Sequence, residues 1–488
     1  MSSPYGNNIH VIGIAGTEGS ALLKYLHFKY PKVKITTHDS SEEKGFLKAF
    51  KDSHVSLKKE QGLEAGREIL SYENVDYHFR ETYLAGIESA DTIFVPQSWY
   101  LYSENKPLEK FKDRFRSISR LYFDLFPGKI IGVTGSQGKT TTTNLIAKIM
   151  KRDFPRTLFS GNDRRTNQVL LMMDEAKKED WLVLEISNRQ LKVDLGRSPD
   201  IGVITNITPN HLTEHKNFED YALTKASLLK YQKETQWSVL NADDPESRKL
   251  IEVDGGETMP FSTQEILPKG VFVEFEQIRI KHADRDEVVM EVSDFPLLGK
   301  HNLSNALAAV AATYLAGVPI DMIAQTLRST ESIPQRLERI ESTDGIEWFN
   351  DSAATSPTAT MAAIETLSQP DKKLILIMGG RSKGLEYEDL AEKIIQQVAR
   401  VILVKSPLAE ELKALLKNRH HDVVEVELLQ DAVMEARKRA EEGDRIVLSP
   451  AGEYFVYFKG KMEGYKNFRH IISLPPPSPR VADQFPKE

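Results

Sequence analysis

Apolar runs rich in β-branched residues alternate with amphipathic stretches of helical spacing along the whole chain. The first run, Ile9 to Ala15, leads through glycines into a helix-like stretch from Ser20 to Phe28, and a second run covers 32–37. Strands and helices that alternate in this way are typical of α/β domains with a largely parallel sheet. The same pattern predicts further strands at 92–96, 129–134, 181–186, 201–207, 237–240, 347–349, 373–378, 400–404 and 445–448.

The alternation restarts twice, at Lys129 and again after an alanine-rich stretch from His301 to Ile320. A chain of 488 residues is long enough for about three domains that each bury a core. We therefore predict three tandem α/β domains. They are a Rossmann-like domain at 1–126, a central, mostly parallel domain like those of P-loop ATPases at 127–330, and a Rossmann-like domain at 331–488.

Composition narrows the class of protein. The 64 basic and 71 acidic residues are interspersed and leave a net charge of −7, which gives no indication of nucleic-acid binding. The absence of cysteine excludes disulfides, thiol chemistry and cysteine-ligated zinc, and it favours a reducing cytoplasm. The first residues lack the basic and apolar segments of a secretory signal. The uncharged stretch at 301–320 carries Asn, Thr and Pro, so we expect a buried soluble helix and no membrane span.

A phosphate-binding loop is predicted where the strand at 129–134 runs into a helix. The segment reads Thr134-Gly-Ser-Gln-Gly-Lys-Thr-Thr141, although Gly132 lies one position earlier than the strict G-x-x-x-x-G-K-S/T spacing requires. Glycines let backbone amides curl around phosphate oxygens, a lysine faces the β and γ phosphates, and a threonine hydroxyl joins a Mg²⁺ shell. We therefore assign ATP binding to Gly135, Ser136, Gln137, Gly138, Lys139, Thr140 and Thr141.

Two later strand ends carry candidate metal ligands. Glu185 closes the apolar run at 181–186, and His211 follows the run at 201–207. Ligands gather at the carboxyl ends of strands in open parallel sheets, so both side chains could approach the phosphates. Taken singly, each has a plainer interpretation, as a solvated strand-end charge and as a loop histidine.

A glycine turn follows the first strand. Gly13, Gly16 and Gly19 could bring backbone amides to a phosphate, and Asp39 could meet a ribose hydroxyl. The spacing is not that of the dinucleotide fingerprint, so an ordinary glycine-rich turn stays an alternative.

The sequence resembles the Mur ligases, the ATP-dependent enzymes that build the peptide of peptidoglycan. Besides the phosphate loop, several segments follow the family's order along most of the chain. They are Leu184-Glu-Ile-Ser-Asn-Arg-Gln-Leu191, Asn206-Ile-Thr-Pro-Asn-His-Leu212, Val239-Leu-Asn-Ala-Asp-Asp244, Gly299-Lys-His-Asn-Leu-Ser-Asn305, Pro334-Gln-Arg-Leu-Glu338, Phe349-Asn-Asp-Ser352, Gly379-Gly-Arg-Ser-Lys383 and Leu448-Ser-Pro-Ala451.

The resemblance implies roles for residues that match the family's motifs. Catalytic groups would be Lys139, Glu185, His211 and a carbamylated Lys225, although alone Lys225 reads as a solvated helix charge. Thr140, Glu185, His211 and Lys225 would support two Mg²⁺ ions. Asn302, Asn305, Arg336 and Asp351 would lie near ATP. The resemblance places the substrates, a UDP-sugar and an amino acid, against Gly16, Thr17, Asp39, Ser187, Thr355, Lys383 and Tyr454.

The segment at 184–191 is most similar to that of the member that adds D-glutamate to UDP-N-acetylmuramoyl-L-alanine. The resemblance thus implies a monomeric ligase of peptidoglycan precursor synthesis with those two substrates. Ala353 replaces a site lysine, Tyr454 replaces a serine, Lys461 replaces a pocket phenylalanine, and Asn210 replaces the aspartate before the metal histidine. L-glutamate or another acidic amino acid therefore stays an alternative acceptor, as does a nucleotide- or muropeptide-binding module without ligase activity.

A chemical argument joins these residues. A carboxylate is a poor electrophile, so we expect ATP to phosphorylate it and an amine to displace the phosphate. Cations around the γ-phosphate would offset the charge of the transferring group. The amine must lose a proton, and His211 is one candidate base. Groups from two domains must converge, so we expect closure to depend on ATP.

Overall fold

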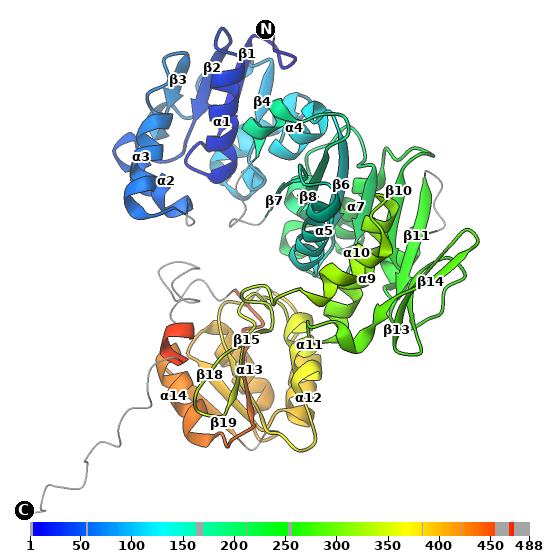
Figure 1. The fold of residues 1–488 in the computed structure, drawn as a ribbon. Helices are drawn as coiled ribbons and strands as arrows, with labels where there is room; N and C mark the ends of the chain where they lie inside the picture. The colour runs from blue at the N-terminus through cyan, green and yellow to red at the C-terminus, as the bar shows by residue number, and fades with distance from the viewer. Residues whose placement is uncertain are drawn as a thin grey trace, which may run out of the picture. The chain divides into compact units, whose positions relative to one another are not determined.

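The computed structural model describes most of the chain, in two compact units (Figure 1). The first unit comprises 1–208, 216–295 and 302–330, and the second comprises 209–215, 296–301 and 331–488. The described residues are 3–54, 57–162, 169–210, 212–251, 256–382, 384–420, 422–453 and 468–472.

The first unit opens with a five-stranded parallel sheet of order β3-β2-β1-β4-β5. The strand order reverses between β1 and β4, and ligands of open α/β sheets bind at the carboxyl ends of the strands at such a point. The turn that contains Gly13 and Gly16 follows β1 at this point. The strands are β1 Asn8–Ile12, β2 Lys34–His38, β3 Val75–His78, β4 Thr92–Phe94 and β5 Phe115–Arg116, and the helices are α1 Thr17–Lys29, α2 Phe46–Ser53, α3 Lys59–Ile69 and α4 Ile118–Leu125.

A row of buried histidines fixes the end of β2. The amide of Leu84 donates to His38 Nδ1 at 3.2 Å, so His38 Nε2 carries the proton and donates to His10 Nδ1 at 2.9 Å. Burial lowers the pKa of His38 to about 3 and that of His10 to about 4, so both rings are neutral at physiological pH. Asp39 follows directly from this fixed strand end.

The same unit contains a nine-stranded sheet of order β14-β13-β12-β11-β10-β9-β6-β8-β7. It is parallel from β7 to β12, and β13 and β14 add an antiparallel edge. Strand β6 lies between β8 and β9, so the ends of these three strands are neighbours. The strands are β6 Lys129–Thr134, β7 Leu158–Gly161, β8 Trp181–Glu185, β9 Ile201–Ile204, β10 Trp237–Asn241, β11 Glu257–Ser262, β12 Gly270–Glu274, β13 Gln277–His282 and β14 Arg285–Glu291, and the helices are α5 Lys139–Asp153, α6 Asn188–Leu191, α7 Phe218–Ala226, α8 Pro245–Arg248, α9 Lys300–Leu315 and α10 Ile320–Arg328.

The alanine-rich stretch forms α9, as predicted, and residues 305–313 are buried. Gly317, with φ +97°, and Pro319 then turn the chain into α10. Among the described residues, none of the helices combines the length and the apolar character needed to cross a bilayer.

The second unit contains a six-stranded sheet of order β15-β16-β20-β17-β18-β19, parallel except for β15. Helices cover both faces. The core of α11, α12 and α13 packs on one face, and α14 packs on the other with Phe468 and Ile472. The strands are β15 Glu338–Ile340, β16 Glu347–Asn350, β17 Leu374–Met378, β18 Arg400–Val404, β19 Val423–Val426 and β20 Arg445–Leu448, and the helices are α11 Pro357–Leu367, α12 Glu388–Gln397, α13 Pro407–Leu416 and α14 Leu429–Arg439.

Candidate active site

The loop between β6 and α5 has the geometry of a phosphate cradle. Gly135 and Gly138 have φ of +149° and +80°, conformations that L-residues rarely adopt. A Cβ on Gly135 would lie 1.9 Å from Thr205 Oγ1, and one on Gly138 would lie 2.1 Å from Asn305 Oδ1. The two glycines are therefore required by backbone conformation and by space. Helix α5 begins directly after them, with its N-terminus at the loop.

The segment after β9 is hydrogen-bonded to this loop. The amides of Ser136 and Gln137 donate to Asn206, to its carbonyl at 2.8 Å and to its Oδ1 at 3.0 Å. Ser136 Oγ donates to the Thr208 carbonyl at 2.9 Å and lies 2.8 Å from the Tyr221 hydroxyl. These two amides already donate to Asn206. The backbone amides that would face a phosphate are therefore those of residues 138–141, at the first turn of α5.

Lys139 folds over the loop. Its Nζ donates to the carbonyls of Gly135 at 2.7 Å and Ser136 at 3.0 Å. Asn305, from α9, accepts a hydrogen bond from Thr142 Oγ1 at 3.3 Å, and Asn302 is buried on the same helix. The predicted residues Lys139 and Asn305 thus lie at one loop, and Asn302 is one turn before Asn305 on α9.

Glu185 ends β8 directly beside β6, where it pairs in register with Val133. Its side chain is 3% exposed. Oε1 accepts a hydrogen bond from Asn162 Nδ2 at 3.3 Å, whereas Oε2 has no hydrogen-bond partner among the residues that the structure describes. A buried carboxylate oxygen in this state fits a cation ligand. The Glu185 carboxylate and the Thr140 hydroxyl at the start of α5 are oxygen ligands that suit Mg²⁺. This ion usually binds to a few protein oxygens and to the phosphates of a nucleotide. Within the described ranges, the structure contains no cluster of three or more histidines or carboxylates that could by itself hold a metal ion.

Lys225, on α7, is 1% exposed. Burial lowers its pKa well below the ordinary value, the charge of Lys139 lowers it further, and Glu185 opposes both. Its Nζ lies 5.1 Å from the centre of the Tyr221 ring. These interactions bring Lys139, Glu185 and Lys225 into one electrostatic neighbourhood and favour a neutral Lys225 amine.

The glycine turn after β1 is held by protein groups. The amides of Gly13, Ala15 and Gly16 donate to the His38 carbonyl, to Asp39 Oδ2 and to the Gly13 carbonyl. Asp39 Oδ1 accepts from the amide of Ser41 at 3.0 Å. Asp39 therefore supports the turn, and a phosphate here would meet the N-terminal end of α1, from Thr17. The ligand roles of Gly16, Thr17 and Asp39 stay predictions.

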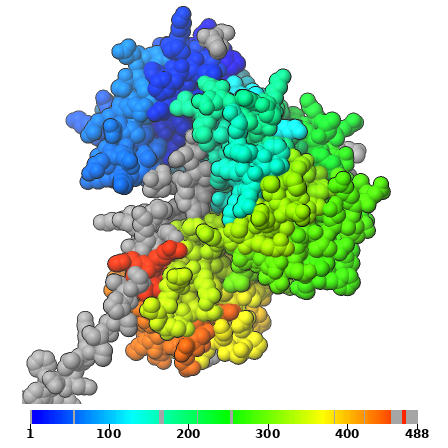
Figure 2. Space-filling view, viewed as in Figure 1, coloured from blue at the N-terminus to red at the C-terminus, as the bar shows by residue number. Residues whose placement is uncertain are grey.

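Ser187 connects the two sheets of the first unit. Its Oγ donates to Gln97 Oε1 at 2.8 Å, and Gln97 follows β4 of the five-stranded sheet. In the space-filling view, the blue surface of the first residues adjoins cyan and green surface of the same unit (Figure 2). The turn after β1 and the end of β8 thus belong to one continuous structure.

Arg336, Asp351 and Thr355 lie in the second unit. Gln335 and Leu337 have φ of +69° and +47°, so a strained backbone carries Arg336 between them. Asp351 accepts hydrogen bonds from the Leu337 amide at 3.1 Å and from Ser449 Oγ at 2.9 Å. Burial raises the pKa of Asp351 to about 7, although these two hydrogen bonds and the charge of Arg336 lower it.

Thr355 is half-buried, four residues after Asp351 and just before α11. The predicted residues His211, Lys383 and Tyr454 lie outside the described residues, as does Lys461.

Five residues that hold the site were not predicted as site residues. Asn206 and Ser449 lie in segments whose motifs we quoted, so their signal was present. The other three are single polar residues outside those segments. They are Asn162, Thr205 and Tyr221.

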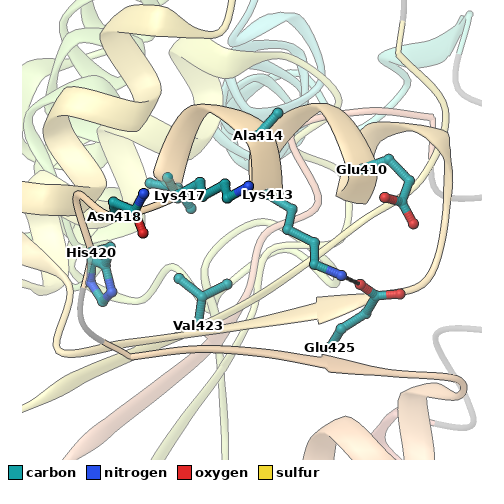
Figure 3. Close-up of a pocket in the computed structure, with 9 residues that line it drawn as sticks. Glu410, Lys413, Ala414, Lys417, Asn418, His420, Val423 and Glu425 are labelled. Carbon is teal, nitrogen blue, oxygen red and sulfur yellow. Dashed lines mark hydrogen bonds and ion pairs between the residues drawn. The ribbon is translucent and has the colours of Figure 1, made fainter.

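A separate pocket of about 390 Å³ lies between α13 and the edge strand β19 (Figure 3). None of the predicted site residues lines it. Lys413 pairs with Glu425. His420 uses both ring nitrogens, on the Val398 carbonyl at 2.8 Å and on the Asp422 amide at 3.1 Å. Those polar side chains already have partners, so this pocket gives no indication of chemistry.

Comparison with known proteins is consistent with this geometry. Residues 133–313 match the family model described as Mur ligase middle domain, and 335–452 match the one described as Mur ligase, glutamate ligase domain. A UDP-N-acetylmuramoylalanine–D-glutamate ligase of Caldanaerobacter subterraneus subsp. tengcongensis is 34% identical over 81% of this chain and 86% of its own length. One of Symbiobacterium thermophilum is 31% identical over 95% and 97%.

Solved structures with the same fold include a pseudomurein peptide ligase type C from Methanothermus fervidus. It has a TM-score of 0.58 and 20% identity, over 96% of this chain and 99% of its own. The UDP-N-acetylmuramate-alanine ligase MurC of Thermotoga maritima has a TM-score of 0.59 and 16% identity, over 94% and 99%. Given the sequence identities over most of its length, the chain belongs to the Mur ligase family.

Proposed function

We propose that this protein is an ATP-dependent amide ligase that adds D-glutamate to UDP-N-acetylmuramoyl-L-alanine, in the cytoplasm, during peptidoglycan precursor synthesis. One observation carries the proposal. The phosphate loop and the partly unsatisfied carboxylate of Glu185 follow the neighbouring strands β6 and β8, and the buried amine of Lys225 interacts electrostatically with both Lys139 and Glu185. The names of the similar ligases support the choice of substrates.

We assign the three predicted regions to three tasks. Residues 1–126 would hold the UDP-substrate at the turn after β1, residues 127–330 would bind ATP, and residues 331–488 would bind the amino acid. Arg336 and Asp351 would approach ATP from the last region, and Thr355 with Lys383 would hold the amino acid's carboxylate.

Lys139 and the first amides of α5 would bind the β and γ phosphates, and Thr140 and Glu185 would hold Mg²⁺. When bound, the metal supplies positive charge against the phosphate oxygens. A second Mg²⁺ would rest on His211 and a carbamylated Lys225. The alanine carboxylate would attack the γ-phosphorus, which gives an acyl phosphate and ADP. The amine of glutamate would then displace phosphate and form the amide, after losing its proton to a base.

Phosphate release in the presence of single amino acids tests the proposal. With UDP-N-acetylmuramoyl-L-alanine, ATP and Mg²⁺, we expect release with D-glutamate well above that with L-glutamate or other amino acids. Release with L-glutamate alone would instead favour the alternative acceptor that Ala353 raises. No release with any amino acid would leave a binding module as the better interpretation.

Lys225 gives a second prediction. A neutral buried amine reacts with CO₂ to form a carbamate and a proton, whereas an ammonium does not. Because its pKa is lowered, carbamylation should proceed near neutral pH and fail as pH falls through that lowered pKa. In CO₂-depleted buffer we expect activity to fall on acidification, and added bicarbonate should restore it.

Variants at this position sharpen the test. Lys225→Ala should lose roughly a hundredfold or more in kcat, and small carboxylates such as acetate should restore part of it. Lys225→Arg, which keeps the charge but forms no carbamate, should not be restored. Lys230→Ala, at an exposed lysine four residues beyond α7, is the matched control. Full activity of Lys225→Ala without any additive would contradict the role.

A further inference from the structure

Glu18 places a buried carboxylate at the point where the strand order of the five-stranded sheet reverses. Glu18 is the second residue of α1, directly after the glycine turn, and it is only 8% exposed. Buried carboxylates are uncommon unless they are fully hydrogen-bonded. The groups that satisfy Glu18 therefore indicate what it holds together.

Its two oxygens bind two different parts of the unit. Oε2 accepts from the backbone amide of Gln97 at 3.0 Å, in the segment that follows β4. Oε1 accepts from Gln190 Nε2 at 3.0 Å, on the short helix α6 that follows β8. One carboxylate thus joins the segments that follow β1 and β4 to the strand end that carries Glu185.

The hydrogen bonds close into a ring. Gln190 Oε1 accepts from the amide of Ser187 at 2.9 Å, and Ser187 Oγ donates to Gln97 Oε1 at 2.8 Å. Ser187 is two residues from Glu185. Charge-assisted hydrogen bonds shielded from water are stronger than neutral ones, so the ring should hold its four members in one arrangement.

We propose that Glu18 is a positioning residue that fixes the UDP-substrate turn after β1 against the Glu185 end of β8. The inference rests on the proposed function, because it concerns the distance between the bound UDP-substrate and the phosphate that its carboxylate must attack. A misplacement of about 1 Å between reacting groups can cost roughly a hundredfold in rate. Glu18 itself touches neither reacting group.

Exchange of the carboxylate and the amide provides a sharp test. In Glu18→Gln the new NH₂ group faces the NH₂ group of Gln190, so one hydrogen bond is lost. In Gln190→Glu two carboxylates face each other. In the double variant Glu18→Gln/Gln190→Glu, residue 18 can again accept from the Gln97 amide and donate to residue 190, which still accepts from the Ser187 amide. All three hydrogen bonds can therefore re-form.

We expect each single variant to lower kcat/KM for UDP-N-acetylmuramoyl-L-alanine by roughly tenfold to a hundredfold, with the KM for ATP unchanged. The double variant should return to within about threefold of the wild type. Glu43→Gln, at an exposed glutamate of the same unit, is the matched control. Thermal unfolding of each variant separates misplacement from loss of folded protein.

The possible outcomes separate this inference from the proposed function. A Glu18→Gln variant with wild-type kinetics, or a double variant no better than the singles, would overturn the positioning role alone. A lower unfolding midpoint with unchanged kcat and KM would show that Glu18 only stabilises the fold, which also overturns it. A wild-type protein that does not turn over this substrate would overturn both.

Discussion

Replacing Lys139 with alanine should lower kcat by about a thousandfold or more. Its Nζ lies within 3.0 Å of the Gly135 and Ser136 carbonyls, so the ammonium is already directed along the phosphate loop. Its removal would deprive the transferring phosphoryl group of the side-chain cation that we assign to it. Steady-state phosphate release under saturating ATP and Mg²⁺ measures the effect.

Lys148→Ala is the matched control for this variant. Lys148 lies on the exposed side of the same helix, where it donates to the Ser329 carbonyl at 2.7 Å, and we expect its loss to leave kcat unchanged. Lys139→Ala should still bind the UDP-substrate, because we propose that its site is at the five-stranded sheet. Loss of both turnover and UDP-substrate binding would mean that the proposed division of tasks is wrong. A kcat above about a tenth of the wild-type value would contradict the role of Lys139.

The strands that sequence reasoning predicted best are the central ones. Those at 129–134, 400–404 and 445–448 have the predicted bounds. These strands are largely buried, so selection for apolar, β-branched residues leaves a continuous run with clear ends. The phosphate loop was predictable for a related reason, because its glycines and Lys139 stand between the end of a strand and the start of a helix.

The antiparallel edge formed by β13 and β14 was not predicted. Strand β13 alternates half-buried and buried residues only over 277–280, and β14 shows no such alternation. The turn from β12 to β13 uses Phe275 and Glu276, and the turn from β13 to β14 uses Ala283, all at positive φ and without a glycine. The usual turn signal is therefore missing. Strand β5 has only two residues, too few for any period to show. Pairing with neighbours that are distant in the sequence decides such elements.

The identity of some site residues could be predicted from the sequence, whereas their interactions in the folded chain could not. Glu185 and Lys225 were named from their places in motifs. Burial and the charge of Lys139 lower the pKa of Lys225, and this effect exists only in the folded chain. The commitment of the Ser136 and Gln137 amides to Asn206 was also not visible in the sequence. Neither was the ring around Glu18, because its members come from three separate segments.

The fate of a carboxylate oxygen should show how the substrate is activated. If the alanine carboxylate of UDP-N-acetylmuramoyl-L-alanine attacks the γ-phosphorus, the oxygen that forms this bond leaves with phosphate when the amine displaces it. The other oxygen stays in the amide. The loop with Lys139 and the Glu185 carboxylate follow neighbouring strands, where we propose that this transfer takes place.

Mass spectrometry of the phosphate released from substrate labelled with ¹⁸O in that carboxylate measures the transfer. We expect one ¹⁸O in each phosphate, formed together with ADP and only when the amino acid is present to complete the turnover. Unlabelled phosphate alongside a newly formed amide would contradict activation by phosphorylation at this sheet edge.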